Sequence, residues 1–580
     1  MPLKEHYDVV ILGAGLAGLS LCRHLLMEDA GKTILLLDNK IEVPGEKQKV
    51  GESLVQVAGY YFSKVLDLEE HLFNHHYLKY NLRFYWKTTS GDRSFEDFSQ
   101  SYIRPFSNVC SYQLDRNVLE AHLLKENSAH ADVEFLNAVA ALKVDLSETG
   151  SHRLEFRQDD AEFAVRADWV VDTTGRGQYI KRKQRLALES EIRHGASWCW
   201  VDGLVNIEKL TDASPSEIRR NPDRREQGMI PLWLATNHFM GEGFWFWVIP
   251  LQGMTSLGLV YDRALFDETQ VSTPEKLVEW ACREFPLFSR DLPHRRILDA
   301  ARLLSYAYDC RQTISPAKWG ISGMAGRFTD PLYSPGSDLI SFYNSMLVDA
   351  ILSRDREELE RKCEIYEPLM KVFYEAYVPS YAISYGALGD QEVFTLKYAW
   401  ELAIYFSFYV FPVINDLFTD RPFIQVFFRK FAQLGPINRN LQTFLIDYFT
   451  WKKEQGIPAP KILNDFMELT PLKVAETAFY EVGTSGSESE DVLARHLENL
   501  KEFARFIYAY VASRILEDGR ALTNRAFVES IRLRTFAFDP DSIRRDFESH
   551  SGCSDSYEWA LDPDGMRKFD RVYARSRTNP

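Results

Sequence analysis

A glycine-rich turn near the N-terminus constrains the fold of this chain more than any other feature. It reads Gly13-Ala14-Gly15-Leu16-Ala17-Gly18, follows the apolar run Tyr7 to Leu12 and precedes the helical pattern Leu19 to Met27. Between a strand and a helix, the first glycine of such a GxGxxG motif permits a tight turn, and the second lets a pyrophosphate approach the backbone. The third lets the helix pack closely on the strand, and the helix N-terminus offers free N–H groups to phosphates.

A second strand and an acidic residue continue this pattern. Thr33 to Leu37 has strand character, and Asp38 follows it, 20 residues after Gly18. At this point an acidic side chain accepts hydrogen bonds from the adenosine ribose of a dinucleotide. The motif, both strands and Asp38 together predict a dinucleotide-binding Rossmann domain, and the alternative is a glycine turn in another α/β fold.

Length and composition indicate the class of protein. With 580 residues the chain exceeds one ordinary core, so we expect two or three domains. Hydrophobic residues make up 45% of the chain and charged residues 26%, which is typical of globular proteins. The net charge of −15 disfavours nucleic acid and anionic membrane as partners.

The cysteines and the N-terminus indicate the compartment. The 7 cysteines are scattered and form no CxxC pair, so we expect neither a metal site nor a disulfide framework. The first residues lead directly into a strand and lack the pattern of a signal peptide. The longest mostly apolar run, Leu402 to Ile414, has 13 residues and is too short for a transmembrane segment. A reducing cytoplasm is the expected location.

Three later segments have counterparts in one class of flavoenzymes. Ala167 to Arg176 is a strand that ends in Asp172-Thr-Thr-Gly175, similar to the segment that returns FAD monooxygenases to the nucleotide domain. Asp115-Arg116-Asn-Val-Leu119 resembles a DRxxL helix start, whose arginine lies near the ribityl chain of the flavin. A surface arginine is the alternative for Arg116. Phe328 to Gly336 resembles the loop and helix N-terminus that face the isoalloxazine ring.

Two more segments narrow the resemblance. Gly51-Glu52-Ser53 precedes Lys79, and Trp245-Phe246-Trp247-Val248-Ile249-Pro250 is the most specific element of the set. Together these segments resemble the flavin-dependent halogenases, a branch of the FAD monooxygenase superfamily. The resemblance covers about residues 5 to 350. Overall the chain is similar to the longer, aminopyrrolnitrin-type chlorinases, which also carry a large helical C-terminal region.

The resemblance implies a reaction and its participants. Reduced FAD, supplied by a separate flavin reductase, reacts with O2, and a halide ion, chloride or bromide, is oxidised to hypohalous acid. In the family this acid crosses a tunnel to a lysine, which delivers the halogen to an electron-rich aromatic ring. A phenol, pyrrole or indole, free or tethered to a carrier protein, is the expected substrate.

Lys79 holds the position of that lysine, 28 residues after Gly51. The alternating pattern of His75 to Phe84 predicts a strand in which Lys79 and Asn81 share one face. An inward-facing lysine needs a partner or a depressed pKa. The alternative is a lysine on a solvated strand.

The tryptophans of the WxWxIP element have a steric role in the resemblance. Trp245 and Trp247 fill the space beside the flavin where a hydroxylase would seat its substrate. The alternative is that they only pack a core strand, and both can be true. The expected catalytic set is Lys79, Ser334, Trp245 and Trp247. The expected FAD-binding set is Gly13, Ala14, Gly15, Ala17, Gly18, Asp38, Ser53, Arg116, Val139, Asp330, Pro331 and Gly336.

The sequence departs from the family at the flavin loop. Gly323-Met324 stands where the superfamily has Gly-Asp, so one hydrogen bond to the ribityl chain is missing, and we expect either weaker FAD binding or compensation from elsewhere. Pro335 and Gly336 stand where two backbone N–H groups hold the halide, and proline has no N–H. Pro335 suits the first turn of a helix that Ser334 would cap and that would run to Leu352.

Two neighbours of this loop bear on the substrate and the halide. Asp338 is a poor neighbour for an anion. Tyr333 stands where the tryptophan halogenases carry a glutamate that assists the lysine, which argues against free tryptophan as substrate.

The predicted fold class is α/β, with a GR2-type FAD-binding Rossmann domain, an inserted β-sheet substrate domain and a mostly α-helical C-terminal region. Residues 1–350 form the first module, with nucleotide-binding parts at about 1–75, 105–180 and 300–350 and the substrate-side sheet at about 76–104 and 181–299. Residues 351–580 form the helical region, with a linker near 483–490 and a polar end, 537–580, that drapes over the surface. The aromatics of Tyr398 to Phe418 line either a helical core or a substrate cavity.

Two other functions stay open. An FAD-dependent monooxygenase or oxidoreductase of the same fold would lack halide chemistry, as Pro335 and Met324 suggest. A non-catalytic flavin-fold protein would bind a partner through its helical third.

Overall fold

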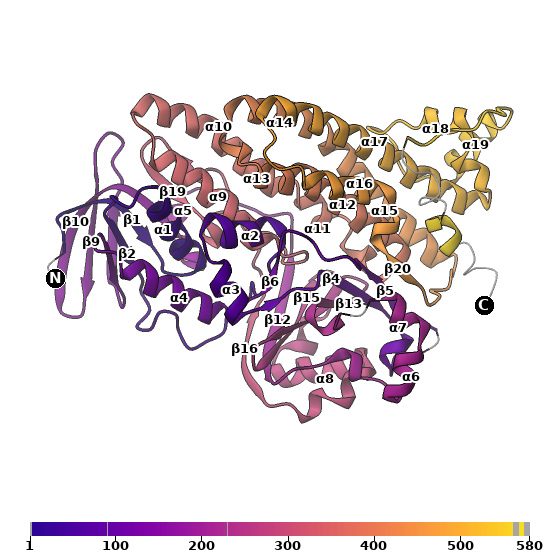
Figure 1. The fold of residues 1–580 in the computed structure, drawn as a ribbon, viewed down its shortest axis with the longest axis horizontal. Coiled ribbons are helices and arrows are strands. Elements are labelled where there is room, and N and C mark those ends of the chain that lie inside the picture. The colour runs from indigo at the N-terminus through magenta and orange to yellow at the C-terminus, as the bar shows by residue number, and fades with distance from the viewer. Residues whose placement is uncertain (1–2, 90, 229, 561–567, 574–580) are drawn as a thin grey trace.

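A parallel sheet carries the glycine turn at its centre. The computed structural model describes residues 3–89, 91–228, 230–560 and 568–573. In it, the strands β1 (His6–Leu12), β2 (Ile34–Leu37), β7 (Val133–Leu136), β10 (Ala161–Asp172) and β19 (Trp319–Ile321) pair in parallel in the order β19-β10-β1-β2-β7 (Figure 1). This order confirms the Rossmann arrangement that the two N-terminal strands predict.

The apolar run of β1 is continuous because both faces of the strand are buried. Val9 and Ile11 belong to the core shared with α1 (Leu16–Glu28) and the helical region. Val10 and Leu12 belong to a separate core with the antiparallel strands β8 (Ala140–Asp145) and β9 (His152–Gln158).

A second sheet combines strands from three parts of the chain. Its order is β16-β12-β15-β14-β13-β4-β5-β20, where β4 (Leu82–Trp86) and β5 (Ser99–Tyr102) precede the others in sequence. β12 (His194–Asp202), β13 (Thr236–Gly241), β14 (Phe244–Leu251), β15 (Met254–Asp262) and β16 (Ile297–Leu303) follow. β20 (Leu463–Asp465) comes from the helical region and pairs in parallel with β5, which the sequence pattern did not predict.

Successive side chains of β14 point to opposite faces of the sheet, so Trp245 and Trp247 share one face. Trp245 and Trp247 contribute to the core shared with the Rossmann module and the helical region. Phe246 and Val248 face the other side of the sheet, where α8 (Pro274–Glu284) packs. The tryptophans therefore lie on the inner face of this sheet.

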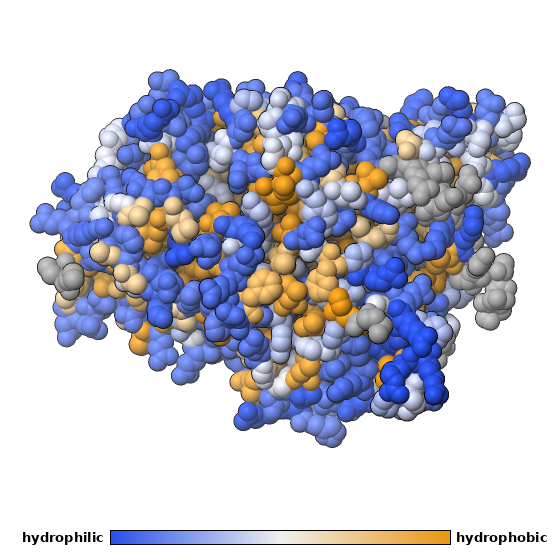
Figure 2. Space-filling model, viewed as in Figure 1, coloured by the Kyte–Doolittle hydropathy of each residue, from blue (hydrophilic) through white to orange (hydrophobic). Residues whose placement is uncertain are grey.

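The helical region continues the same core. Its main helices are α10 (Arg356–Glu375), α12 (Gln391–Tyr405), α15 (Leu434–Glu454) and α17 (Gly486–Leu516), which lie above the sheets in Figure 1. Leu19 of α1, Trp245 of β14 and Phe503 of α17 belong to one hydrophobic cluster. Figure 2 shows hydrophilic side chains over most of the face of the molecule that is viewed in Figure 1, with apolar side chains gathered near its middle. None of the described helices is both long and apolar enough for a membrane span.

The predicted linker near 483–490 was wrong in its second half. Residues 486–490 lie in α17 and not in a linker, because Ser485 and Glu488 form a capping box that starts the helix there. In the polar end, α19 (Pro540–His550) buries Ile543 and Phe547, so this part packs as a helix. Residues 561–567 and 574–580 lie outside the described residues.

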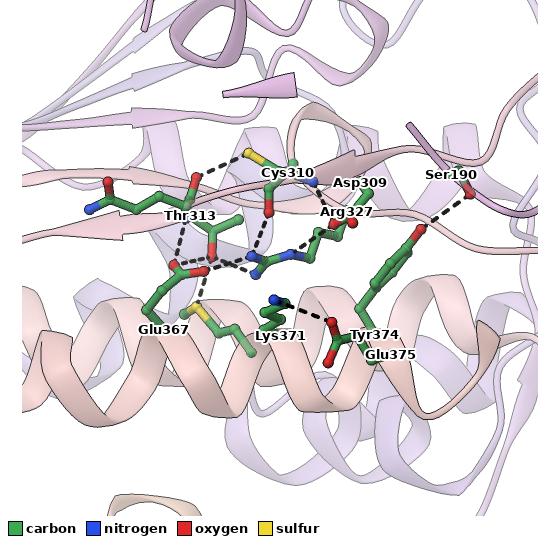
Figure 3. A network of polar contacts seen from close by, with 12 residues as sticks. Ser190, Asp309, Cys310, Thr313, Arg327, Glu367, Lys371, Tyr374 and Glu375 are labelled. Carbon is green, nitrogen blue, oxygen red and sulfur yellow. Dashed lines mark hydrogen bonds and ion pairs between the residues drawn. The ribbon is translucent and has the colours of Figure 1, made fainter. Parts of the chain in front are cut away.

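A buried ion pair joins α10 to the Rossmann module. Arg327 is fully buried and donates from Nη2 to Glu367 Oε1 at 2.6 Å and to Cys310 O at 2.6 Å. Glu367 Oε2 accepts from the backbone N–H groups of Thr313 at 2.6 Å and Ile314 at 3.2 Å. Figure 3 shows these groups facing one another between the two layers.

Replacing Arg327 by methionine should lower the free energy of unfolding by about 2–4 kcal/mol, because the mostly shielded carboxylates of Glu367 and Asp309 would lose their cation. Denaturant unfolding followed by circular dichroism measures this change. Arg354→Met is the matched control, since Arg354 pairs with Glu358 on the same helical region but is 85% exposed. The control should change stability by less than about 1 kcal/mol. Equal effects of the two variants would contradict the prediction.

Candidate active site

The glycine turn has the geometry that nucleotide binding requires. Gly13 has φ +104, and a Cβ there would lie 2.6 Å from Thr173 O. A Cβ at Gly18 would lie 2.0 Å from Gly13 O, so α1 packs directly on the turn. Around Gly15 there is nothing within 4 Å of a Cβ, and no side chain caps α1 at this residue. The open space and the free N–H groups fit the phosphates of a dinucleotide.

The segment Asp172-Thr-Thr-Gly175 supports this turn from β10. Thr173 Oγ1 donates to Leu12 O at 2.9 Å and to Gly13 O at 2.7 Å. Met324, where the superfamily has an aspartate, follows Gly323, whose added Cβ would lie 3.2 Å from Ala17 Cβ. The departure therefore lies beside the turn.

Asp38 lies at the end of β2 and holds the turn in place. Its Oδ2 accepts from Ala14 N at 2.8 Å, and its Oδ1 accepts from Lys40 N at 2.9 Å. Val139 N donates to Asp38 O at 2.9 Å, which places both residues at one end of the sheet. Each carboxylate oxygen keeps a free lone pair, so a ribose contact stays a prediction.

Arg116 begins α4 (Arg116–Ser128), as the DRxxL pattern predicts, and Asp115 caps this helix through its side chain. The guanidinium is half-buried, donates from Nη1 to Val50 O at 2.8 Å and pairs with Glu120. Burial opposes the charge on Glu120, but Arg116 and Lys49 outweigh it and lower the pKa of this carboxyl. Arg116 is thus fixed beside Gly51, whose added Cβ would lie 3.0 Å from its Nη1.

Lys79 is buried, but the strand predicted around it is interrupted. β3 (Tyr77–Leu78) ends before it and β4 begins at Leu82, because Asn81 has φ +58 and breaks the alternation. Lys79 is 2% exposed. Its Nζ donates to Ser53 Oγ at 2.8 Å and to Leu54 O at 2.5 Å.

The described residues give Lys79 no carboxylate in ion-pair contact. Burial lowers the pKa of Lys79 to about 7, and the more distant Asp338 opposes this shift only in part. A buried lysine without an ion pair costs stability, and such groups concentrate at functional sites.

This burial predicts a pH-dependent stability difference between the parent protein and Lys79→Met. The folded pKa lies below the value of 10.5 for a free lysine, so between these two pH values the unfolded chain binds the extra proton. Below pH 7 the cost is present in full, and it shrinks as the pH rises. Lys79→Met should therefore be more stable than the parent at pH 6, with a smaller difference at pH 9. Denaturant unfolding at both pH values measures it, and a difference that does not depend on pH would contradict the burial of a titrating amine.

The Lys79 cavity, a hollow of about 80 Å³, lies between the inner face of the second sheet and the helical region. Its wall is mainly apolar in area, and it also includes the polar side chains of Gln56, Lys79, Asn81, Ser111, Ser380, Glu401 and Asn438. The lining includes Gln56, Lys79, Asn81, Leu82, Ile103, Tyr333, Tyr398, Glu401, Leu402, Tyr405, Phe406 and Tyr409. Phe408 instead packs against Phe427 and Phe431 in the core. The aromatic segment predicted as core or cavity wall is therefore both.

Trp245 and Trp247 are held by hydrogen bonds as well as by packing. Trp245 Nε1 donates to Tyr385 Oη at 2.6 Å, and Trp247 Nε1 donates to Ser256 Oγ at 3.0 Å. Ser256 Oγ donates to Glu52 Oε2 at 2.8 Å, and burial raises the pKa of Glu52 to about 8. Glu52 adjoins Ser53, so this network reaches the residue that accepts from Lys79.

Asp330 is the centre of a second buried network. Its Oδ2 accepts from Tyr385 Oη at 3.1 Å and Tyr306 Oη at 2.9 Å and contacts His194 Nδ1 at 2.6 Å. Its Oδ1 accepts from Leu332 N at 2.8 Å, so the carboxylate shapes the loop that carries it. A direct role toward FAD stays a prediction.

The loop before α9 (Pro335–Ile351) is strained. Tyr333 has φ +69 and Ser334 has φ +62, which is uncommon for residues with a side chain. Ser334 precedes the helix but makes no side-chain cap, so the predicted capping role was wrong. The left-handed backbone of Ser334 departs from the extended conformation of an N-cap residue. Ser334 N donates instead to Pro331 O at 2.9 Å.

The first turn of α9 brings Gly336 and Asp338 near the cavity. A Cβ at Gly336 would lie 2.8 Å from the ring of Phe328. Asp338 Oδ1 accepts from Ala58 N at 2.9 Å, and its Oδ2 accepts from Tyr405 Oη at 2.8 Å. Burial raises the pKa of Asp338 to about 7, which weakens its repulsion of an anion near neutral pH.

The structure brings Lys79, Ser53 and Tyr333 to the cavity region and keeps the glycine turn, Asp38 and Val139 together at the Rossmann sheet. Sequence reasoning missed Tyr385, Glu401 and Tyr306 as site residues. Their positions depend on tertiary contacts, and no local spacing indicates them. No group of metal-binding side chains is found among the described residues.

Halogenases are found among the proteins to which this chain is similar. No protein-family model matches the chain. It is 25% identical over 451 residues to the flavin-dependent halogenase chlA of Dictyostelium discoideum, covering 72% of this chain and 73% of that protein. It is 24% identical over 356 residues to a brominase of Pseudoalteromonas luteoviolacea named for 1H-pyrrole-2-carbonyl on a peptidyl-carrier protein, covering 60% and 77%.

Solved structures show the fold. The crystal structure of the halogenase PltM matches 98% of this chain and 99% of its own, with a TM-score of 0.59 and 16% identity. The complex of PltM with phloroglucinol and FAD matches with a TM-score of 0.56 and 17% identity over 98% and 99% of the two chains. The chain thus resembles the flavin-dependent halogenases in sequence and has the fold of a solved halogenase over nearly its whole length.

Proposed function

We propose that this protein is a flavin-dependent halogenase that transfers an electrophilic halogen, through Lys79, to an electron-rich aromatic substrate. The observation that carries the proposal is the buried Lys79 amine at the wall of a largely apolar cavity. Its pKa of about 7 leaves both the neutral and the charged amine accessible near neutral pH. The neutral amine could carry the halogen as a nucleophile, and the charged amine could direct hypohalous acid as a hydrogen-bond donor.

FAD fits the residues around the glycine turn. The turn would hold the pyrophosphate, Asp38 the adenosine ribose, and Arg116 the ribityl side of the molecule. Bound in its reduced form, FAD would supply two of the four electrons that O2 accepts, and the halide would supply the other two as it is oxidised to hypohalous acid. A separate flavin reductase would provide the reduced cofactor.

The chain's own residues would separate this oxidation from the substrate. Trp245 and Trp247 are fixed by hydrogen bonds to Tyr385 and Ser256, so they can form a rigid wall that excludes the substrate from the flavin. Lys79 then receives the halogen within the cavity. The ring carbon gains the halogen and loses a proton, and water is the second product.

A halogenation assay tests this function. The protein is incubated with FAD, a flavin reductase, NADH and either chloride or bromide, and phenol, pyrrole and indole substrates are offered, free and carrier-bound. Mass spectrometry should detect a halogenated product whose formation requires halide. The carrier-bound arm follows from the brominase relative.

An FAD-dependent monooxygenase is the second candidate. Pro335 removes one of the two N–H groups expected to hold the halide, and Phe328 covers the neighbouring Gly336. This function predicts an oxygenated product that forms equally without halide. The same assay in halide-free buffer separates the two functions.

A further inference from the structure

One carboxylate oxygen in the Lys79 cavity is buried and has no partner. Glu401 lies on α12 and lines the cavity. Its Oε2 makes no hydrogen bond to any described residue. An acceptor left without a donor in a buried site is costly, so its free oxygen points to a ligand.

The other oxygen of Glu401 is held firmly. Oε1 accepts from Lys397 Nζ at 2.6 Å, from Gln442 Nε2 at 2.8 Å and from Ser380 Oγ. Lys397 is fully buried and forms an ion pair with this carboxylate. Turning Glu401 to pair Oε2 would break these contacts, so the free acceptor is preorganised.

A second polar atom stands beside it. Tyr333 Oη is buried and close enough to interact with Glu401, but no hydrogen bond of normal geometry joins it to any described residue. Burial, and next the nearby Glu401, raise the pKa of Tyr333 well above its ordinary value, so this hydroxyl keeps its proton and can donate. The cavity thus offers one charged acceptor and one neutral donor near each other.

A ligand hydroxyl satisfies both groups at once. It donates to Glu401 Oε2 and accepts from Tyr333 Oη, whereas the N–H of a pyrrole or indole donates but has no lone pair to accept with. The remaining walls include Leu82, Tyr398 and Phe406, which suit a flat apolar ring. This pairing selects hydroxylated aromatics over N–H heterocycles.

We propose that Glu401 determines specificity by binding a phenolic hydroxyl of the substrate, with Tyr333 donating to the same oxygen. The inference rests on the proposed function, because it takes the Lys79 cavity as the substrate site. No bond is made or broken at Glu401. The hydrogen bond orients the ring toward Lys79 and raises the electron density at the ring carbons ortho and para to the hydroxyl.

A binding experiment without flavin or halide tests this role. Calorimetric titrations use phloroglucinol, 1,3,5-trimethoxybenzene and pyrrole as probes. The parent protein should bind phloroglucinol about threefold more tightly than pyrrole, whose N–H donates to Glu401 but cannot accept from Tyr333. It should bind phloroglucinol at least about tenfold more tightly than the ether, which cannot donate to the charged Glu401. Glu401→Gln should weaken phloroglucinol binding by about tenfold and remove most of this preference.

Tyr333→Phe is the matched variant. It should weaken phloroglucinol binding by about threefold, because it removes one neutral hydrogen bond, and it should keep the preference over the ether. A parent protein without the preference, or Glu401→Gln with the full preference, overturns the inference. If Glu401→Gln does not fold, as circular dichroism would show, the comparison of the three probes on the parent decides.

The binding titrations and the halogenation assay can have different outcomes, and each tests a different proposal. A Glu401-dependent preference in a protein that never halogenates keeps this inference and rejects the proposed function. Halogenation by a protein that binds phloroglucinol and its ether equally rejects the inference and keeps the function.

Discussion

Lys79→Met should lower the rate of product formation by about 10²–10⁴-fold, the range over which a positioned side chain assists proton or group transfer. Methionine has a similar length and fills the same space, so the cavity keeps its shape. The amine that donates to Ser53 and Leu54 is the only feature removed there. Product formation with each halide, followed by chromatography and mass spectrometry, measures the loss.

The reductive half of the reaction should survive this change. Lys79 donates to Ser53 and Leu54, while the hydrogen bonds that hold the glycine turn come from Asp38 and Thr173, so FAD affinity and NADH consumption should stay within about threefold of the parent. The reductant would then be used without an organic product. Lys181→Met is a matched control, since Lys181 is also buried and donates to a backbone carbonyl, Gly326 O at 3.0 Å. Its product formation should remain within about threefold of the parent. Halogenation by Lys79→Met at the parent rate would reject the assigned role.

The parts of the site that sequence predicted are those in which backbone geometry is encoded locally. Position 13 requires glycine because its φ is positive, and position 18 requires glycine because an added Cβ would lie 2.0 Å from Gly13 O. The spacing of one motif predicts both glycines. Asp172-Thr-Thr-Gly175 and the DRxxL start of α4 are local in the same sense. Such patterns can be recognised in a sequence because few residue types satisfy the backbone geometry that each position requires.

The parts that sequence missed depend on distant contacts. Lys79 was expected on a strand, but Asn81 takes a positive φ that no alternation of residues reveals. Asp330 is held by His194, Tyr306 and Tyr385, which lie between 24 and 136 residues away along the chain. Glu401 lines the same cavity as Lys79 only because α12 packs over the inner face of the second sheet. The substrate side of the site is therefore assembled by the helical region, whose helices were predicted but whose packing was not.

Gly18→Ala should abolish stable flavin binding, because the added methyl group has no room. The Cβ would lie 2.0 Å from Gly13 O and 2.6 Å from Thr173 Oγ1, and neither neighbour is the end of a flexible chain. α1 must therefore shift away from the turn, which displaces the N–H groups meant for the pyrophosphate. We expect FAD affinity to fall at least about tenfold and the free energy of unfolding to fall by about 1–3 kcal/mol. Quenching of flavin fluorescence and denaturant unfolding measure the two effects.

Gly435→Ala separates this effect from a general response to the loss of a glycine. Gly435 is exposed near the start of α15, with nothing within 4 Å of an added Cβ. Alanine there should leave FAD affinity unchanged and alter the free energy of unfolding by less than about 1 kcal/mol, with the sign favouring stability. If Gly18→Ala binds FAD as tightly as Gly435→Ala does, the turn is not the pyrophosphate site. The protein would then lack the pyrophosphate site expected of a flavoenzyme, because the contact between Gly18 and Gly13 is the feature that fixes the N-terminus of α1 over the turn.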